Sequence, residues 1–198
     1  MTRDNSSTEY KKLKKRINEI KKHFDFKQNT TGPTKEQEDK LRGFILLCHA
    51  EFENYFEKLA LEILEKAEKN WTKKRIANYN LASLFINSSI KKDMYCITLS
   101  MKIISDFKKS MEGNNGIKET NLKNMFEPLG VYIDSSFDSV FIASLNSFGV
   151  ERGKIAHAST IGTREVLDKK NKFETVEYLL DQIIIFEKEV KNYKGNKP

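Results

Sequence analysis

The hydrophobic positions of this chain recur with the period of an α-helix. The clearest run lies between about residues 35 and 70, where apolar side chains are separated by three or four positions. Thr34 and Gln37 have the spacing of a capping box at its start. We therefore predict a long helix over about 35–70, whose core-facing positions are Ile45, Cys48, Phe52, Tyr55, Leu59 and Ile63.

A second polar stripe lies roughly 100° around the same predicted helix. It contains Arg42, His49, Glu53 and Ala60. His49 and Glu53 are four positions apart, so their side chains can meet on the helix surface. This stripe is either a polar flank of a core helix or a support for charged groups elsewhere in the fold.

The N-terminal segment over residues 8–25 predicts a basic amphipathic helix. Its narrow apolar seam consists of Tyr10, Leu13, Ile17, Ile20 and Phe24. Between Lys11 and Lys22 there are seven basic residues and one Glu. The helix could pack on the domain with solvated lysines, pair with a second copy, or follow a phosphate backbone. In the last case Lys11, Lys12, Lys14 and Lys15 are the candidate RNA-binding residues.

The break at Gly32 and Pro33 divides the chain into a basic helix with its linker, 1–33, and a helical domain, 34–198. Residues 71–92 are less regular. A helix is predicted from a cap at Asp93 to the sequence GNNG, and a short helix from Ile117 that Pro128 and Gly130 stop. A third helix begins at a cap at Asp134 or Ser135 and continues through the following apolar run. The last helix is predicted over about 173–193. The third of these places Phe137, Val140, Phe141, Ser144, Leu145 and Phe148 on one face. The apolar face of the last consists of Val176, Leu179, Leu180, Ile183, Phe186 (or Glu187) and Val190. No strand pattern persists, so we expect an all-α bundle of five to seven helices.

Composition limits the partners and the compartment. The chain has 198 residues, enough for one well-filled core, and a formal net charge of +7, which favours RNA, DNA or an anionic membrane surface. A merely lysine-rich soluble protein would show the same charge. Cys48 and Cys96 lie in apolar segments without zinc-ligand spacing, which predicts buried thiols in a reducing cytoplasm. No apolar run approaches the roughly 20 residues that cross a bilayer, and no signal peptide is visible. We therefore expect a cytoplasmic protein without a membrane partner.

The common enzyme motifs are missing from the sequence. Phosphate-binding and dinucleotide-binding glycine loops, the serine-hydrolase elbow and the zinc-protease helix motif do not occur. No metal and no cofactor are expected. Of the three histidines, His23 is a predicted surface residue on the lysine-rich helix, and His49 belongs to the polar stripe described above. The remaining one, His157, follows Arg152 by five positions and is the candidate for chemistry.

Arg152 and His157 supply complementary chemistry. Five residues along a helix turn through about 140° beyond one full revolution, so the two side chains lie on adjoining faces and their tips could converge on one anion. An arginine is a permanent fork-shaped donor for phosphate, and a histidine can carry a proton near neutral pH. Metal-free RNA cleavage needs these two roles.

The segment "ERGKIAHAS" resembles the R-x4-6-H signature of the HEPN superfamily. The segment "LRGFILLCHAEFENYFEKLALEIL" resembles the long first core helix of RiboL-PSP-HEPN domains, and "IKETNLKNMFEPLGVYI" resembles the segment that precedes their signature helix. The resemblance covers roughly residues 36 to 190. One departure is Gly153, which stands where family members often carry a polar residue, typically Asn, after the arginine.

This resemblance implies a metal-independent endoribonuclease, commonly a toxin or an anti-phage effector, that forms a homodimer with a composite cleft. Arg152 would then stabilise the scissile phosphate and His157 would act as general acid or base. Glu151, Lys154, Asn146 and Glu53 are weaker supporting candidates, and a solvated helix position is the alternative for the first three. An antitoxin or another defence-system protein is a possible partner.

Two other readings remain open at this point. Some members of the superfamily are non-catalytic and bind RNA, nucleotides or protein partners. Alternatively, Arg152 and His157 serve only the fold, as buried side chains that pair with Glu53 or another acid.

Overall fold

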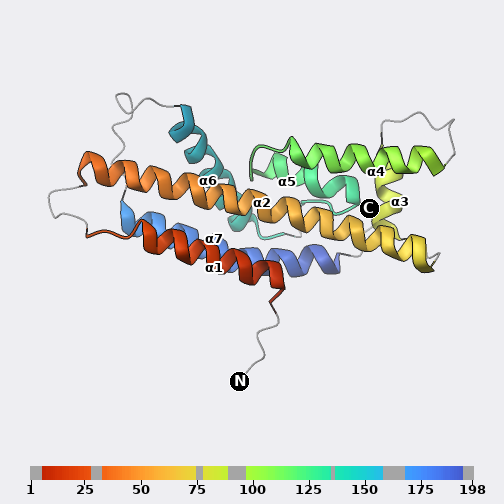
Figure 1. The fold of residues 1–198 in the computed structure, drawn as a ribbon, viewed down its shortest axis with the longest axis horizontal. Coiled ribbons are helices and arrows are strands. Elements are labelled where there is room, and N and C mark those ends of the chain that lie inside the picture. Colours follow the sequence, from red (N-terminus) through yellow and green to blue (C-terminus); the bar gives the residue numbers. More distant parts are fainter. Residues whose placement is uncertain are drawn as a thin grey trace, which may run out of the picture.

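The computed structural model describes residues 6–27, 33–74, 78–88, 97–134, 137–157 and 168–193. Within these ranges the chain is helical and contains no strand, which confirms the predicted all-α class (Figure 1). The helices are α1 (Thr8–His23), α2 (Lys35–Lys74), α3 (Tyr79–Asn87), α4 (Ile97–Glu112), α5 (Glu119–Phe126), the 3-10 turn η1 (Glu127–Leu129), α6 (Ser139–His157) and α7 (Lys169–Asn192).

The long helix α2 is the axis of the fold. It has 40 residues, which at about 1.5 Å per residue makes a rod of roughly 60 Å. The helices α1, α3, α5, α6 and α7 all contact it, so its apolar side chains are covered from several directions. The six core positions predicted for it are all buried. The helix continues to Lys74, about four residues beyond the predicted end, because nothing between Asn70 and Lys74 breaks a helix.

Helix α1 lies along α2 and α7. Ser7 caps it by accepting the N–H of Tyr10 at 3.0 Å. Four of the five predicted seam residues are buried, and Phe24 is half-buried at the C-terminal end. The helix therefore contributes to the same core as the rest of the chain. The division of the chain into 1–33 and 34–198 stays a prediction.

A buried carboxylate joins three helices. Glu187 of α7 is 4% exposed, and its carboxylate accepts hydrogen bonds from Ser7 at 3.0 Å, Tyr55 at 2.8 Å and Lys191 at 2.6 Å. Burial raises the pKa of Glu187, but these donated hydrogen bonds outweigh it and hold the pKa below its usual range. The ionised carboxylate thus fastens the start of α1 to α2 and α7.

Two predicted helix starts are wrong. Helix α6 begins at Ser139, where Asp138 accepts the N–H of Val140 at 2.8 Å, rather than at Asp134 or Ser135. Ser135 lies outside the described residues. Val140 belongs to the first turn and is 63% exposed, so it does not belong to the buried face of this helix.

Helix α7 begins at Lys169, with Asp168 as its N-cap, four residues before the predicted Phe173. The first turn, Lys169–Lys172, consists of polar residues. It was missed because the prediction relied on the spacing of apolar residues. The predicted apolar face of α7 is confirmed.

The region predicted as irregular contains α3, which Asn78 caps through the N–H of Asn80. Helix α4 is described from Ile97 onward, so the predicted cap at Asp93 lies outside the described residues, as does Cys96. Gly130 ends η1 with a φ of 78°, a backbone conformation that side chains rarely adopt, and this confirms the predicted stop.

Replacing Glu187 with Gln should lower the free energy of unfolding at pH 7 by about 1.5–3 kcal/mol, because it removes a charged acceptor that several donors share. The folded pKa of Glu187 is depressed, so its contribution is complete above the unfolded pKa and is lost as the pH falls through the folded one. The difference between wild type and Glu187→Gln should therefore shrink below about pH 4.3. Urea unfolding across pH 3–7 measures it. Glu189→Gln, on the exposed side of the same helix, is the matched control, and an equal loss in both variants would contradict the prediction.

Candidate functional site

Helix α6 presents two different faces. On the inner face, Phe141, Leu145 and Phe148 are buried, and the same spacing of four and three residues continues to Arg152 and Ile155, which are half-buried. Arg152 therefore continues the helix stripe whose earlier members, Phe141, Leu145 and Phe148, belong to the core. The inner face points toward α2, which α6 contacts.

The outer face of α6 is exposed from end to end. It carries Val140, Ala143, Ser147, Val150, Lys154 and His157, again three and four residues apart. His157 is the last residue of the helix and is exposed. Within one chain the R-x4-H pair is thus divided between an inward arginine and an outward histidine.

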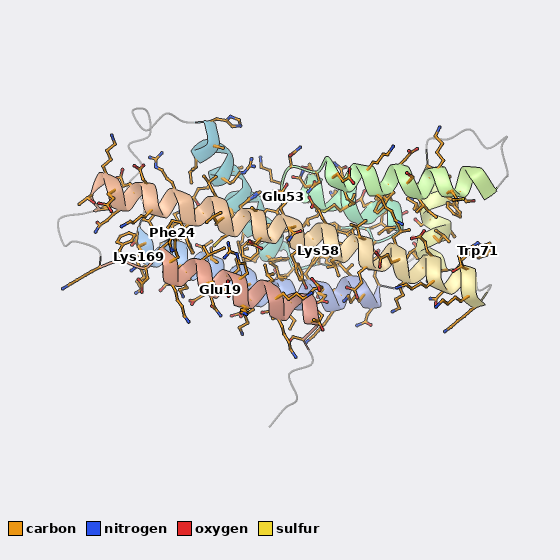
Figure 2. All side chains as sticks on the ribbon, in the orientation of Figure 1. Glu19, Phe24, Glu53, Lys58, Trp71 and Lys169 are labelled. Carbon is orange, nitrogen blue, oxygen red and sulfur yellow. The ribbon has the colours of Figure 1, made fainter. Side chains whose placement is uncertain are left out.

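Arg152 stands above a polar part of α2. Its charge acts on His49 and on Glu53, two residues that are one turn apart on α2. The ring of His49 stacks on Phe148 with a centroid distance of 6.2 Å, and Phe148 lies one turn before Arg152 on α6. His49 Nδ1 is 3.6 Å from Glu53 Oε2. In Figure 2, Glu53 lies on α2 close to where α6 and the loop before α5 meet that helix.

The electrostatics of this group follow from burial. His49 is 2% exposed, and burial, followed by the positive charges of Arg152 and Lys118, lowers its pKa to about 4. The imidazole is therefore neutral at pH 7. Burial and the neighbouring Glu57 raise the pKa of Glu53, whereas Arg152 and the backbone N–H of Gly116 oppose that rise. His49 is thus a buried neutral ring on the polar flank of α2.

Loop residues before α5 hold the other side of the group. Asn114 donates to Glu57 at 3.2 Å, and Asn121 donates to Asn114 at 3.1 Å. At Gly116 an added Cβ would lie 2.9 Å from Asn121 Oδ1, so a side chain at this position would have to displace the Asn121 amide. From the sequence GNNG we predicted only the end of a helix. Glu53 and Glu57 are four positions apart on α2, and this spacing could have suggested a carboxylate acceptor for the amide of Asn114.

Asn146 and Glu151, two of the weaker candidates, are bonded within the fold. Asn146 Oδ1 accepts the N–H of Glu119 at 2.7 Å and so satisfies a donor in the first turn of α5. Glu151 pairs with Lys172 of α7 at 2.6 Å. The solvated-position alternative is therefore wrong for these two residues, whereas Lys154 is exposed, as that alternative expects.

Gly153 has open space around it. A Cβ built at this position meets no atom within 4 Å, and its backbone shows no positive φ. Neither packing nor backbone geometry requires glycine here. An Asn side chain of the kind often found in the family would fit at this position within one chain.

The purely structural alternative required both side chains of the motif to be buried and bonded within one chain. His157 is exposed, so the alternative fails for His157. Arg152 is half-buried and near Glu53, so it has a place in the fold as well as a position at the site.

The lysine-rich face of α1 lies far from this region. Lys11, Lys12, Lys14 and Lys15 are exposed along α1 at the lower edge of Figure 1, while the C-terminal end of α6 rises at the upper edge. Lys12 pairs with Glu9 at 2.6 Å and Lys15 approaches Glu19 at 4.0 Å. Within one chain these lysines and the R-x4-H pair cannot contact the same phosphate.

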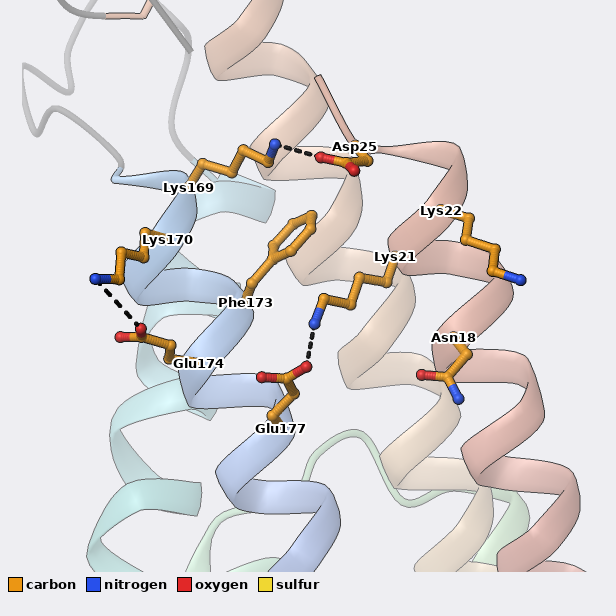
Figure 3. A pocket seen from close by; sticks show the side chains of 9 residues that line it. All are labelled: Asn18, Lys21, Lys22, Asp25, Lys169, Lys170, Phe173, Glu174 and Glu177. Carbon is orange, nitrogen blue, oxygen red and sulfur yellow. Dashed lines mark hydrogen bonds and ion pairs between the residues drawn. The ribbon is translucent and has the colours of Figure 1, made fainter. Parts of the chain in front are cut away.

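A cleft of about 680 Å³ lies between α1 and α7 (Figure 3). Phe173 lies against it, and Lys21 sits 5.3 Å from the centre of the Phe173 ring. Lys21 pairs with Glu177, Lys169 with Asp25, and Lys170 approaches Glu174 at 3.8 Å. These ion pairs compensate most of the lysine charge and fasten the end of α1 to α7.

No metal-binding cluster is found in the described ranges: no three His, Cys, Asp or Glu side chains there are grouped so that they could hold an ion. Nor is any described helix long and apolar enough to cross a membrane. Cys48 is buried, as predicted, and burial raises the pKa of its thiol.

Comparison with known families agrees with the fold and the motif. The family model RiboL-PSP-HEPN matches residues 11–185, which includes most of α1 and runs well into α7. The chain therefore belongs to the RiboL-PSP-HEPN family, which confirms the resemblance of the sequence. Searches of curated proteins and of solved structures found no match.

Replacing Asn146 with Ala should lower the free energy of unfolding by about 1 kcal/mol, because a helix N-terminal donor loses its side-chain acceptor. Asn146→Asp should recover this loss, since a carboxylate accepts the same bond and interacts favourably with the helix N-terminus. Urea unfolding compares the two variants. Ser147→Ala is the control, because the exposed Ser147 hydroxyl bonds only to the carbonyl of Ala143 in its own helix. A fully stable Asn146→Ala would refute the capping role.

Proposed function

We propose that this protein is a metal-independent endoribonuclease of HEPN type that acts as a homodimer. The observation that carries the proposal is the end of α6 in a member of this family, where a half-buried arginine and an exposed histidine stand five residues apart. In this proposal Arg152 and His157 are the catalytic residues.

The reaction is an in-line transesterification. The 2′-oxygen of a ribose attacks the adjacent phosphorus, a new P–O2′ bond forms, and the P–O5′ bond breaks to leave a 2′,3′-cyclic phosphate and a free 5′-hydroxyl. One proton leaves the 2′-hydroxyl and one reaches the departing 5′-oxygen. His157 acts as general acid or base in one of these transfers, and Arg152 stabilises the charge on the phosphorane.

In this proposal a second copy of the chain completes the site. His157 lies on the outer face of α6 and Arg152 on the adjoining inner face. In this proposal a partner that meets the outer face near the end of α6 brings its own pair, and the two chains together form a composite cleft. Val140 and Val150 are 63% and 45% exposed on that face, which suits an apolar contact. A toxin or anti-phage effector, restrained by an antitoxin or another defence-system protein, is the biological role that we propose for such an enzyme.

Wild-type protein should cleave single-stranded or structured RNA in excess EDTA and leave 2′,3′-cyclic phosphate ends. His157→Ala should lose about 10²–10⁴-fold in rate, because a positioned proton carrier typically contributes that much. Arg152→Ala should lose activity as well. End-group analysis of cleaved total RNA and tRNA measures the product, and circular dichroism checks the fold.

His23→Ala is the matched control for this assay, since His23 is an exposed histidine at the end of α1. It should cleave at the wild-type rate. Wild-type protein that is inert on these RNAs, or a His157→Ala variant as active as His23→Ala, would rule out the proposal.

The second candidate function is a non-catalytic module that binds RNA through α1. The observation that favours it is the exposure of Lys11, Lys12, Lys14 and Lys15 along one helix. Phosphate contacts make such binding fall steeply as the salt concentration rises.

If the second function holds, changing these four lysines to Gln should remove most of the salt-sensitive affinity for RNA, while His157→Ala should change it little. Fluorescence anisotropy at several salt concentrations measures both. The charge-matched control changes Lys66, Lys69, Lys73 and Lys74, which are exposed near the end of α2. Equal losses in the two four-lysine variants would indicate a general charge effect and reject an α1 site.

A further inference from the structure

A third stripe of α6 lies between its inner and outer faces and meets the start of α5. Its members are Ile142, Asn146, Gly149 and Gly153, again three and four residues apart. Asn146 accepts the N–H of Glu119 at 2.7 Å, which fixes the first turn of α5 against this stripe. The contact between the two helices therefore begins at this point and can be followed toward the C-terminal end of α6.

Lys118 covers the stripe one turn further along α6. A Cβ built at Gly149 would lie 2.9 Å from Lys118 Cγ and 3.5 Å from Lys118 Cε, so the hydrocarbon stem of Lys118 lies directly on the α6 backbone. A side chain at Gly149 would have to displace this stem. Lys118 is the residue just before α5, and it is half-buried. Its ammonium group is bonded to Cε and is therefore held close to this turn of α6.

The next residue of the stripe, Gly153, is uncovered. A Cβ built there meets no atom of the described residues within 4 Å. Arg152 borders this open space as the preceding residue, and His157 borders it one helical turn later on the same side of α6. Lys118 borders it from Gly149, one turn before. The space above Gly153 is thus flanked by two cations and by the proposed proton carrier.

The two cations beside this space have no acid of their own. Glu119, next to Lys118 in the chain, pairs instead with Lys123 at 2.7 Å. Arg152 acts on Glu53 through its charge, but among the residues that the structure describes no ion pair joins Arg152 or Lys118 to a carboxylate. Two such cations on either side of an open space are suited to hold an anion that comes from outside the chain.

We propose, on the basis of the ribonuclease function above, that Lys118 is a second phosphate-binding residue of the site and that the RNA phosphate to be cleaved lies over Gly153. Lys118 and Arg152 donate to the non-bridging oxygens of this phosphate. The absence of a side chain at Gly153 lets the phosphate approach the helix backbone closely. The charge that develops on the phosphorane is then shared by cations from two separate segments of the chain.

Three substitutions test the charge of Lys118 separately from its packing. Lys118→Met keeps an unbranched stem on Gly149 and removes the charge. Lys118→Arg keeps the charge. Lys109→Met is the matched control, because Lys109 is an exposed lysine of α4 and has no part in the proposed site. Urea unfolding should give all three variants the stability of wild type, since no ion pair is removed.

Binding is measured with an RNA oligonucleotide in which fluorine replaces every 2′-hydroxyl, so that it cannot be cleaved. In about 0.1 M salt, Lys118→Met should bind it about fivefold more weakly than wild type. The slope of log affinity against log salt should fall by about 0.7, the value for one phosphate contact on a single strand. Lys118→Arg and Lys109→Met should bind as wild type does. Fluorescence anisotropy measures all four proteins.

In the cleavage assay, Lys118→Met should lower kcat/KM by about 10²-fold, because the loss of one donor to developing charge typically has that effect. Lys118→Arg should recover most of the loss. The binding measurement involves no cleavage, so it separates this inference from the ribonuclease proposal. If wild type is inert on RNA but binds the fluorinated RNA with the expected dependence on Lys118, the ribonuclease proposal fails and the phosphate site stands.

The inference is overturned if Lys118→Met binds the fluorinated RNA with the affinity and salt dependence of Lys109→Met, or if wild type does not bind it at low salt. A Lys118→Arg variant as weak as Lys118→Met would overturn it too, because packing on Gly149 and not charge would then matter. Should Lys118→Met fail to fold, Lys118→Gln takes its place, and wild-type binding by that variant is the contrary outcome.

Discussion

The fold depends on covering α2. Its buried residues include thirteen side chains spread around the helix, from Leu41 to Ala67, and no single neighbour can cover them all. The helices α1, α3, α5, α6 and α7 each take one part of that surface. Helix α4 packs on α3 and also reaches α2, where Lys108 pairs with Glu68 at 3.0 Å. Burial of apolar area is the main favourable term in such a bundle, so the positions of the other helices follow from the faces of α2. The site is located where α6 crosses this rod.

At that crossing the apolar pattern is interrupted on both helices. His49 and Glu53 interrupt it on α2, and Arg152 interrupts the inner stripe of α6. Each polar group alone would be expensive to bury, and the positive charge of Arg152 acts on both His49 and Glu53.

The two members of the R-x4-H pair have different structural status. Changing Arg152 disturbs a half-buried ionic group and can affect the fold, whereas His157 is exposed and free of such duties in the described structure. His157 is therefore the cleaner probe of chemistry. Gly153, between them, is surrounded by open space, which leaves room for a partner or a substrate to approach the backbone of α6 closely.

The sequence by itself determined the helical class, the core faces of α1, α2 and α7, and the family, because apolar period and local motif are both written in consecutive residues. It also identified Arg152, His157 and Glu53 as residues of interest. It misplaced the starts of α6 and α7, since Asp138 and Asp168 act as caps through local geometry that several nearby acids could have supplied. Only the tertiary structure decided that Asn146 caps another helix, that Glu151 pairs with α7, and that His49 is a buried neutral ring. Each of these features depends on contacts between segments that are far apart in the chain. The helical period predicts which face of a helix is polar, but it does not predict which other segment packs against that face.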